Sequence, residues 1–147
     1  MNEQRKFINA CCFPDGLFMI VNSPHTPSRK DLKECMYLAC SCGNLNIVKY
    51  LISTYQIHPG HYELERASSN GHFEVVQLIT KYVKSDYKVP IEYASMKGHR
   101  EIREFLFFLD TSVDMTLANM LYKKVDYKLE EHDISKFVDT LDEVISL

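Results

Sequence analysis

A sequence motif that occurs three times at nearly constant spacing constrains the fold of this chain more than any other feature. Each copy places an alanine four residues before a glycine, and successive glycines lie 28 and 27 residues apart. Self-similarity at such a period is typical of stacked repeats, in which each unit buries its apolar face against its neighbours. The alanines are Ala39, Ala67 and Ala94, and the glycines are Gly43, Gly71 and Gly98.

Each copy predicts two short antiparallel helices joined by a glycine turn. The alanine lies late in the first helix, where a small side chain lets a neighbouring helix approach. The glycine follows where the chain must reverse, a position that usually needs a left-handed backbone. Apolar residues then recur at helical spacing, which predicts the second helix and an all-α chain with one continuous core. These residues are Leu45, Val48, Leu51 and Ile52, then Phe73, Val76 and Ile79, then Ile102, Phe105 and Leu106.

The repeated motif resembles the ankyrin repeat, whose consensus includes Pro-Leu-His-x-Ala-Ala-x-x-Gly-His-x-Glu-Ile-Val. The third copy matches over residues 90–102 and the second over residues 64–76. The resemblance implies an ankyrin-like solenoid of stacked helix-turn-helix repeats. It also implies that His72 and His99 bond the backbone of the adjoining turn. The sequence of these repeats resembles the ankyrin-repeat sequences that are common in large DNA viruses and amoebae.

The chain departs from the ankyrin pattern in its connections. The Thr-Pro opening is missing from the first two copies, and Glu65 and Glu92 stand where the consensus has histidine. The period is also shorter than usual for the family, and the deficit falls in residues 53–62 and 81–89. The family projects a β-hairpin finger there, so we expect truncated fingers or plain loops.

The repeats organise the chain as a single ankyrin-repeat domain over residues 1–147. Residues 17–21 form either the second element of a degenerate repeat or a strand. The amphipathic pattern after Asp133 predicts a helix that either caps the stack or binds a partner outside it. The expected parts are an N-terminal cap over 1–27, three core repeats over 28–110, and a C-terminal degenerate repeat with a capping helix over 111–147.

Two helix starts are marked by residue type. Ser28 followed by Asp31 predicts the beginning of the first repeat's first helix. Pro90 is expected at the first helical position of the third repeat, where its missing N–H costs nothing.

Charge argues against nucleic acid as a partner. The formal net charge is −3 with a pI near 6.1, so the basic stripe expected of a nucleic-acid-binding protein is missing. Residues 126–147 hold seven acidic residues against two lysines, a net charge of −5. This acidic end is either a solvated helix face or a docking tail for a basic partner.

Cysteine usage and apolar patterning predict an intracellular, cytoplasmic protein. Five cysteines form an odd count without the spacing of a disulfide framework, which suits a reducing compartment. No run approaches the roughly 20 apolar residues of a membrane span, and the first residues lack a signal-peptide pattern, so we expect no membrane partner. A viral origin would place the protein in the host cell cytoplasm.

The candidate metal and catalytic residues form no convincing site. His58 and His61 lie three apart, and Cys40 and Cys42 two apart, whereas a zinc site needs about four converging ligands. Phosphate-binding glycine patterns are missing, and any Cys–His nucleophilic pair would be an arbitrary choice. We therefore expect no enzyme, no metal and no cofactor. A metal- or thiol-dependent enzyme is the remote alternative.

The ankyrin resemblance implies where a partner would bind. In that family the contact positions are the residue before the alanine and the two before the glycine. We therefore expect a monomeric, non-catalytic adaptor or decoy that binds another protein in a concave groove. The alternative is an assembly subunit that uses the repeats as a scaffold. The implied contact residues are Leu38, Ser41, Cys42, Arg66, Ser69, Asn70, Tyr93, Met96 and Lys97.

Overall fold

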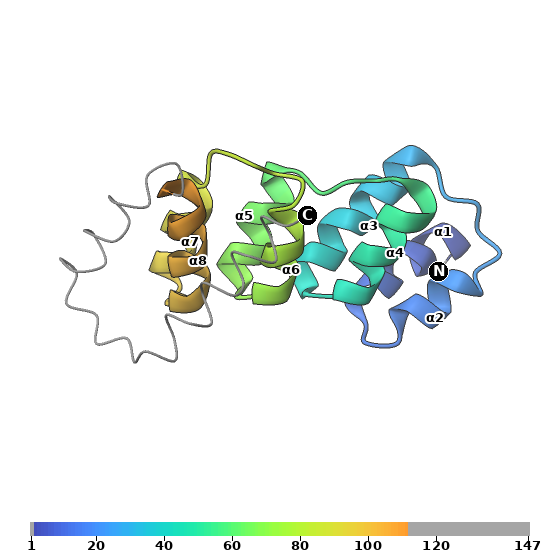
Figure 1. Cartoon of the computed structure of the whole chain (residues 1–147). Helices are drawn as coiled ribbons and strands as arrows, with labels where there is room; N and C mark the ends of the chain where they lie inside the picture. Colours follow the sequence, from blue (N-terminus) through green and yellow to red (C-terminus); the bar gives the residue numbers. More distant parts are fainter. Residues whose placement is uncertain (1, 112–147) are drawn as a thin grey trace.

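The computed structural model describes residues 2–111, and every regular element in that range is a helix (Figure 1). Apart from Thr111, the expected C-terminal degenerate repeat and capping helix lie outside the described residues. The elements are α1 (Glu3–Asn9), the 3₁₀ helix η1 (Ala10–Cys12), α2 (Gly16–Val21), α3 (Arg29–Cys42), α4 (Leu45–Tyr55), α5 (His61–Asn70), α6 (Phe73–Ile79), α7 (Lys88–Met96) and α8 (Arg100–Thr111).

The helices form two layers that run along one row of helix pairs (Figure 1). Helices α3, α5 and α7 pack side by side as the inner layer, and α4, α6 and α8 form the outer layer. Neighbouring inner helices make more extensive contact than neighbouring outer helices. Ala39, Ala67 and Ala94 are completely buried and permit this contact. The predicted all-α, ankyrin-like solenoid is confirmed.

The three glycine turns are equivalent bends of one stack. Gly43, Gly71 and Gly98 have φ angles of 76°, 81° and 77°, the left-handed conformation that side chains disfavour. In every turn the residue after the glycine donates its backbone N–H to the carbonyl of the repeat's alanine, at 2.8, 3.0 and 2.8 Å. These bonds satisfy carbonyls that the end of a helix leaves without a partner.

One core runs through all the repeats. Most of the predicted apolar positions are fully buried, while Leu45, Ile52 and Phe73 are partly buried against the same core. Phe73 of α6 meets Phe105 of α8 edge to face, with ring centroids 5.5 Å apart. Each fully buried aliphatic side chain stabilises the fold by roughly 1.5–3 kcal/mol, so the stack depends on contacts between repeats.

Helices α1, η1 and α2 precede the first repeat, and we name this segment the cap. Helix α1 packs on α3 and α2 packs on α4, so the cap extends both layers. Residues 17–21 lie in a helix, and the alternative that they form a strand is wrong. At the turn before α2, a side chain on Gly16 would overlap the carbonyl oxygen of Ala10, so the approach of α2 to η1 requires glycine.

A buried carboxylate fastens the cap to the first repeat. Ser28 and Asp31 form the capping box of α3, in which the Ser28 N–H donates to Asp31 Oδ2 at 3.0 Å. Gln4 Nε2 of α1 donates to Asp31 Oδ1 at 2.8 Å, and His25 Nε2 lies 3.0 Å from Oδ2. A carboxylate only accepts, so His25 carries its proton on Nε2. These donors, the Ser28 N–H first, hold the pKa of Asp31 well below its usual range.

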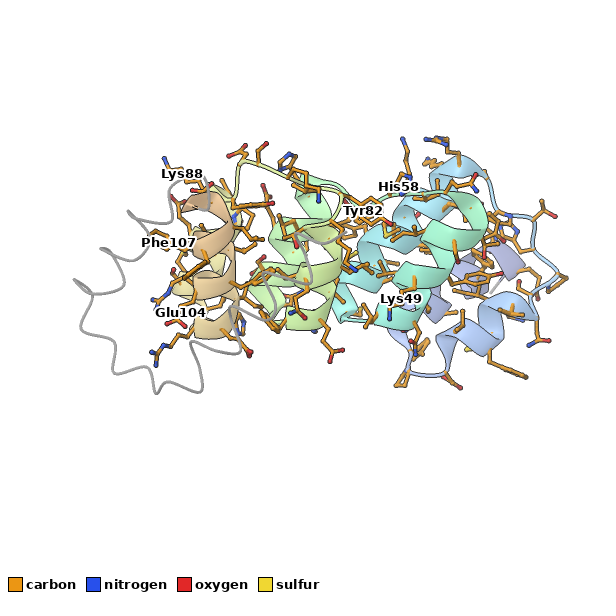
Figure 2. The ribbon with its side chains drawn as sticks, viewed as in Figure 1. Lys49, His58, Tyr82, Lys88, Glu104 and Phe107 are labelled. Carbon is orange, nitrogen blue, oxygen red and sulfur yellow. The ribbon has the colours of Figure 1, made fainter. Side chains whose placement is uncertain are left out.

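The connections between repeats are plain loops in the described residues. Residues 56–60 and 80–87 contain no strand where the family projects its fingers. The rings of His58 and Tyr82 instead stack across the two loops, with centroids 4.8 Å apart and planes 18° from parallel (Figure 2). Gln56 and Asp86 adopt positive φ angles of 54° and 64°, which allow these short loops to reverse.

Pro90 lies deeper in its helix than the sequence predicted. Helix α7 begins at Lys88, so Pro90 occupies the third helical position instead of the first. The first-turn N–H groups of a helix have no intrahelical acceptor, so proline is tolerated there as well.

Candidate partner-binding face

The exposed side chains of α3, α5 and α7 form one continuous surface, which we name the inner-helix face. Six of the nine residues expected to contact a partner are exposed, and Leu38 is half-buried against the core. Ser41 is also half-buried, and Ser69 is only 9% exposed. The exposed six are Cys42, Arg66, Asn70, Tyr93, Met96 and Lys97.

Arg66, Tyr93 and Met96 give this face its chemical character. Arg66 on α5 and Tyr93 on α7 occupy equivalent positions of neighbouring repeats, and these two helices pack directly together. Tyr93 is 40% exposed and Met96 is 77% exposed. Arg66 forms no ion pair with any residue in 2–111. Together they present a guanidinium, an aromatic ring and a thioether on two inner helices that pack together.

A tyrosine pair extends the face toward the first repeat. The rings of Tyr37 on α3 and Tyr62 on α5 stack with centroids 5.5 Å apart and an interplanar angle of 28°. Tyr62 remains 64% exposed. The repeat pattern does not predict this pair, because the two tyrosines are not at equivalent repeat positions and only the packing of α3 on α5 brings them together.

Several of the expected contact residues hold neighbouring repeats together. Asn70 Nδ2 donates to the Ser41 carbonyl oxygen at 2.8 Å and contacts Ser41 Oγ at 3.1 Å. His72 Nε2 donates to the same carbonyl at 2.9 Å, and His99 Nε2 donates to the Ser69 carbonyl at 3.0 Å. The backbone of Ser41 and Ser69 and the side chain of Asn70 are therefore engaged within the stack.

Each of the two histidines also lies against the glycine of the preceding repeat. A Cβ placed on Gly43 would overlap the His72 ring, and one on Gly71 would lie 2.6 Å from His99 Cε1. Each of these two histidines thus bonds a carbonyl of the preceding repeat and packs against the α-carbon of its glycine. Both side chains bond the backbone of the adjoining turn, the contact that the ankyrin resemblance implies for His72 and His99.

Three of the five cysteines, Cys11, Cys12 and Cys40, lack the lowered pKa of an activated nucleophile. A hydrogen bond to Cys35, followed by burial, raises the pKa of Cys11 far above its usual range. Burial raises the pKa of Cys40, and partial burial followed by a hydrogen bond to Cys42 raises that of Cys12 to about 11. A reactive thiol needs a lowered pKa. Within residues 2–111, no three cysteine, histidine or acidic side chains converge as metal ligands would.

The described part of the chain contains no helix suited to span a membrane. None of its helices combines the length and the apolar character that crossing a bilayer requires.

Comparison with known proteins places the repeats in a family. A family model described as ankyrin repeats (3 copies) matches residues 36–119, more than half of the chain. No curated protein and no solved structure matches the chain. The matched segment contains the three glycine turns, both histidine contacts and all nine expected contact residues. The chain belongs to the ankyrin-repeat family.

Proposed function

We propose that this chain is a non-catalytic adaptor or decoy that binds another protein on its inner-helix face. Ankyrin repeats are generally protein–protein interaction modules. The observation that carries the proposal is the exposure of Arg66, Tyr93 and Met96 on inner helices that pack together, where the core does not need them.

These three residue types suit a protein partner. Arginine and tyrosine dominate the binding energy of many protein interfaces, because each buries a large, directional side chain. Methionine adds a flexible apolar contact that adapts to the shape of a partner. Tyr62, stacked on Tyr37, offers a further rigid aromatic surface at the adjoining pair of inner helices.

Substitution of Arg66 and Tyr93 tests the proposal. The double variant Arg66→Ala/Tyr93→Ala should lose at least about 2 kcal/mol of partner-binding free energy, because both large contact side chains are removed from the inner-helix face. Its Tm should stay nearly unchanged, since neither side chain belongs to the buried core. Affinity capture from the native cell, followed by quantitative mass spectrometry, compares the proteins retained by each form.

A matched control removes two exposed charges from the outer layer. Lys49→Ala/Glu74→Ala alters α4 and α6 on the opposite layer, and Lys49 is marked in Figure 2. This variant should retain the partners that Arg66→Ala/Tyr93→Ala loses. Equal retention of the same partners by both double variants would refute binding at the inner-helix face.

An assembly subunit is the second candidate, because the cap exposes apolar side chains. Phe18 on α2 is 73% exposed, and Phe13, Met19 and Val21 around it are exposed as well. An adaptor should be monomeric at micromolar concentration in size-exclusion chromatography with light scattering. A stable oligomer that Phe18→Ser/Val21→Ser dissociates would favour the assembly function instead.

A non-catalytic role also fits the family and the thiols. Ankyrin repeats are typically non-enzymatic. Burial and raised pKa values keep the Cys11 and Cys40 thiols protonated at neutral pH, which opposes nucleophilic catalysis by either residue.

A further inference from the structure

Two pairs of cysteine thiols connect the N-terminal cap to the first repeat. The Cys11 and Cys35 thiols lie near each other and are completely buried. The Cys12 and Cys42 thiols also lie near each other, and both cysteines are exposed. In each pair the first cysteine belongs to η1 and the second to α3. We name Cys12 and Cys42 the surface thiol pair.

Hydrogen bonds from the Asn44 side chain, independent of the sulfurs, hold the segments that carry the surface thiol pair together. Asn44, two residues beyond Cys42, donates its Nδ2 to the Phe13 carbonyl at 2.8 Å and to the Cys11 carbonyl at 3.4 Å. The carbonyls on both sides of Cys12 are therefore fixed against the turn that ends α3. Helix α3 also packs directly on η1. The two thiols consequently meet at a defined place in the fold.

We propose that the surface thiol pair is a site of reversible oxidation, at which exchange with a low-molecular-weight disulfide such as glutathione disulfide links Cys12 to Cys42. The new bond clamps the cap onto the first repeat. A disulfide between exposed cysteines is open to attack by thiols, so reduced glutathione reverses the reaction.

The exchange proceeds in two balanced steps. The Cys42 thiolate attacks one sulfur of glutathione disulfide, whose S–S bond breaks and releases one glutathione thiolate. The Cys12 thiolate then attacks the Cys42 sulfur, forms the protein disulfide and releases the second glutathione thiolate. Two protein thiols lose two electrons and two protons, and the glutathione disulfide gains them as two glutathione thiols.

Accessibility selects this pair over the other cysteines. Cys11 and Cys35 lie in the core, where a glutathione molecule cannot reach either sulfur. Cys40 is also completely buried, and its thiol donates to Met36 Sδ at 3.7 Å instead of facing another cysteine. Only Cys12 and Cys42 combine a neighbouring thiol with exposure to solvent.

The experiment treats the reduced full-length chain with glutathione disulfide. Mildly alkaline buffer is used, because the raised pKa of Cys12 makes exchange slow at neutral pH. Intact mass spectrometry should show that the protein has lost the mass of two hydrogens and carries no covalently attached glutathione. Non-reducing peptide mapping should show Cys12 joined to Cys42. The Tm should rise by about 10 °C, because the bond closes a long loop of the unfolded chain, and should fall again with reductant.

Two single variants provide the controls. Cys42→Ser should accumulate one glutathione on Cys12, and Cys12→Ser one glutathione on Cys42, because neither has a thiol to complete the exchange. The proposal would be overturned by stable mixed disulfides on the chain without cysteine substitutions, by no reaction at either cysteine, or by a cross-link between other cysteines. A Cys12–Cys42 bond that leaves the Tm unchanged would overturn the clamping role.

Discussion

Replacing Gly71 by alanine should destabilise the stack by roughly 3 kcal/mol, a large share of the stability of a small domain. Two effects add at this position. The φ angle of 81° forces alanine into a left-handed conformation that costs about 1–2 kcal/mol. The added Cβ also lies 2.6 Å from His99 Cε1, so the ring must move and weaken its bond to the Ser69 carbonyl. Urea unfolding followed by circular dichroism measures the loss.

Gly98→Ala is the matched control for Gly71→Ala. Gly98 has nearly the same φ angle, 77°, but no described atom lies within 4 Å of a Cβ placed there. This variant should therefore lose only about 1–2 kcal/mol, the cost of backbone strain. Equal losses for the two variants would contradict the claim that the histidine packs on the preceding glycine.

Replacing Asp31 by asparagine should cost about 3 kcal/mol at neutral pH. The carboxylate accepts from the Ser28 N–H and from Gln4 Nε2, and it lies 3.0 Å from His25 Nε2. An amide of the same shape has only one acceptor oxygen, so at least one of these donors would face an N–H group. Chemical denaturation at neutral pH measures the difference. Glu34→Gln, which alters an exposed carboxylate of the same helix, should cost less than about 0.5 kcal/mol.

The Asp31 contribution should also depend on pH in a defined direction. Folding lowers the pKa of this carboxyl, so its stabilisation is complete above the unfolded-state value of about 4. The contribution is lost as the pH falls from there through the folded-state pKa, because the unfolded chain then binds the proton more readily. The stability gap between the native chain and Asp31→Asn should therefore shrink below about pH 4. A gap that stays constant to lower pH would contradict the buried-carboxylate assignment.

The repeat architecture was predictable because its signals are local and occur three times. Ala39, Gly43 and their counterparts mark helix packing and chain reversal through size and backbone conformation alone, and the structure places all three sets equivalently. Ser28 and Asp31 marked a helix start for the same reason, since a capping box depends on a spacing of three residues.

The cap contacts and the details of the face were not predictable. Gln4 meets Asp31, and Cys12 meets Cys42, because α1 and η1 pack on α3 across 27 and 30 residues of sequence, without a repeated pattern to fix the register. The burial of Ser69 likewise depends on how closely α7 approaches α5. Such facts follow from distances between elements, which periodicity does not specify.

Binding at the inner-helix face is tested most directly by calorimetric titration of a purified, captured partner. We expect Lys49→Ala/Glu74→Ala to bind with native affinity and Arg66→Ala/Tyr93→Ala to bind at least about 30-fold more weakly, which corresponds to about 2 kcal/mol. Native affinity in the Arg66→Ala/Tyr93→Ala variant, or a comparable loss in Lys49→Ala/Glu74→Ala, would contradict the proposed binding face.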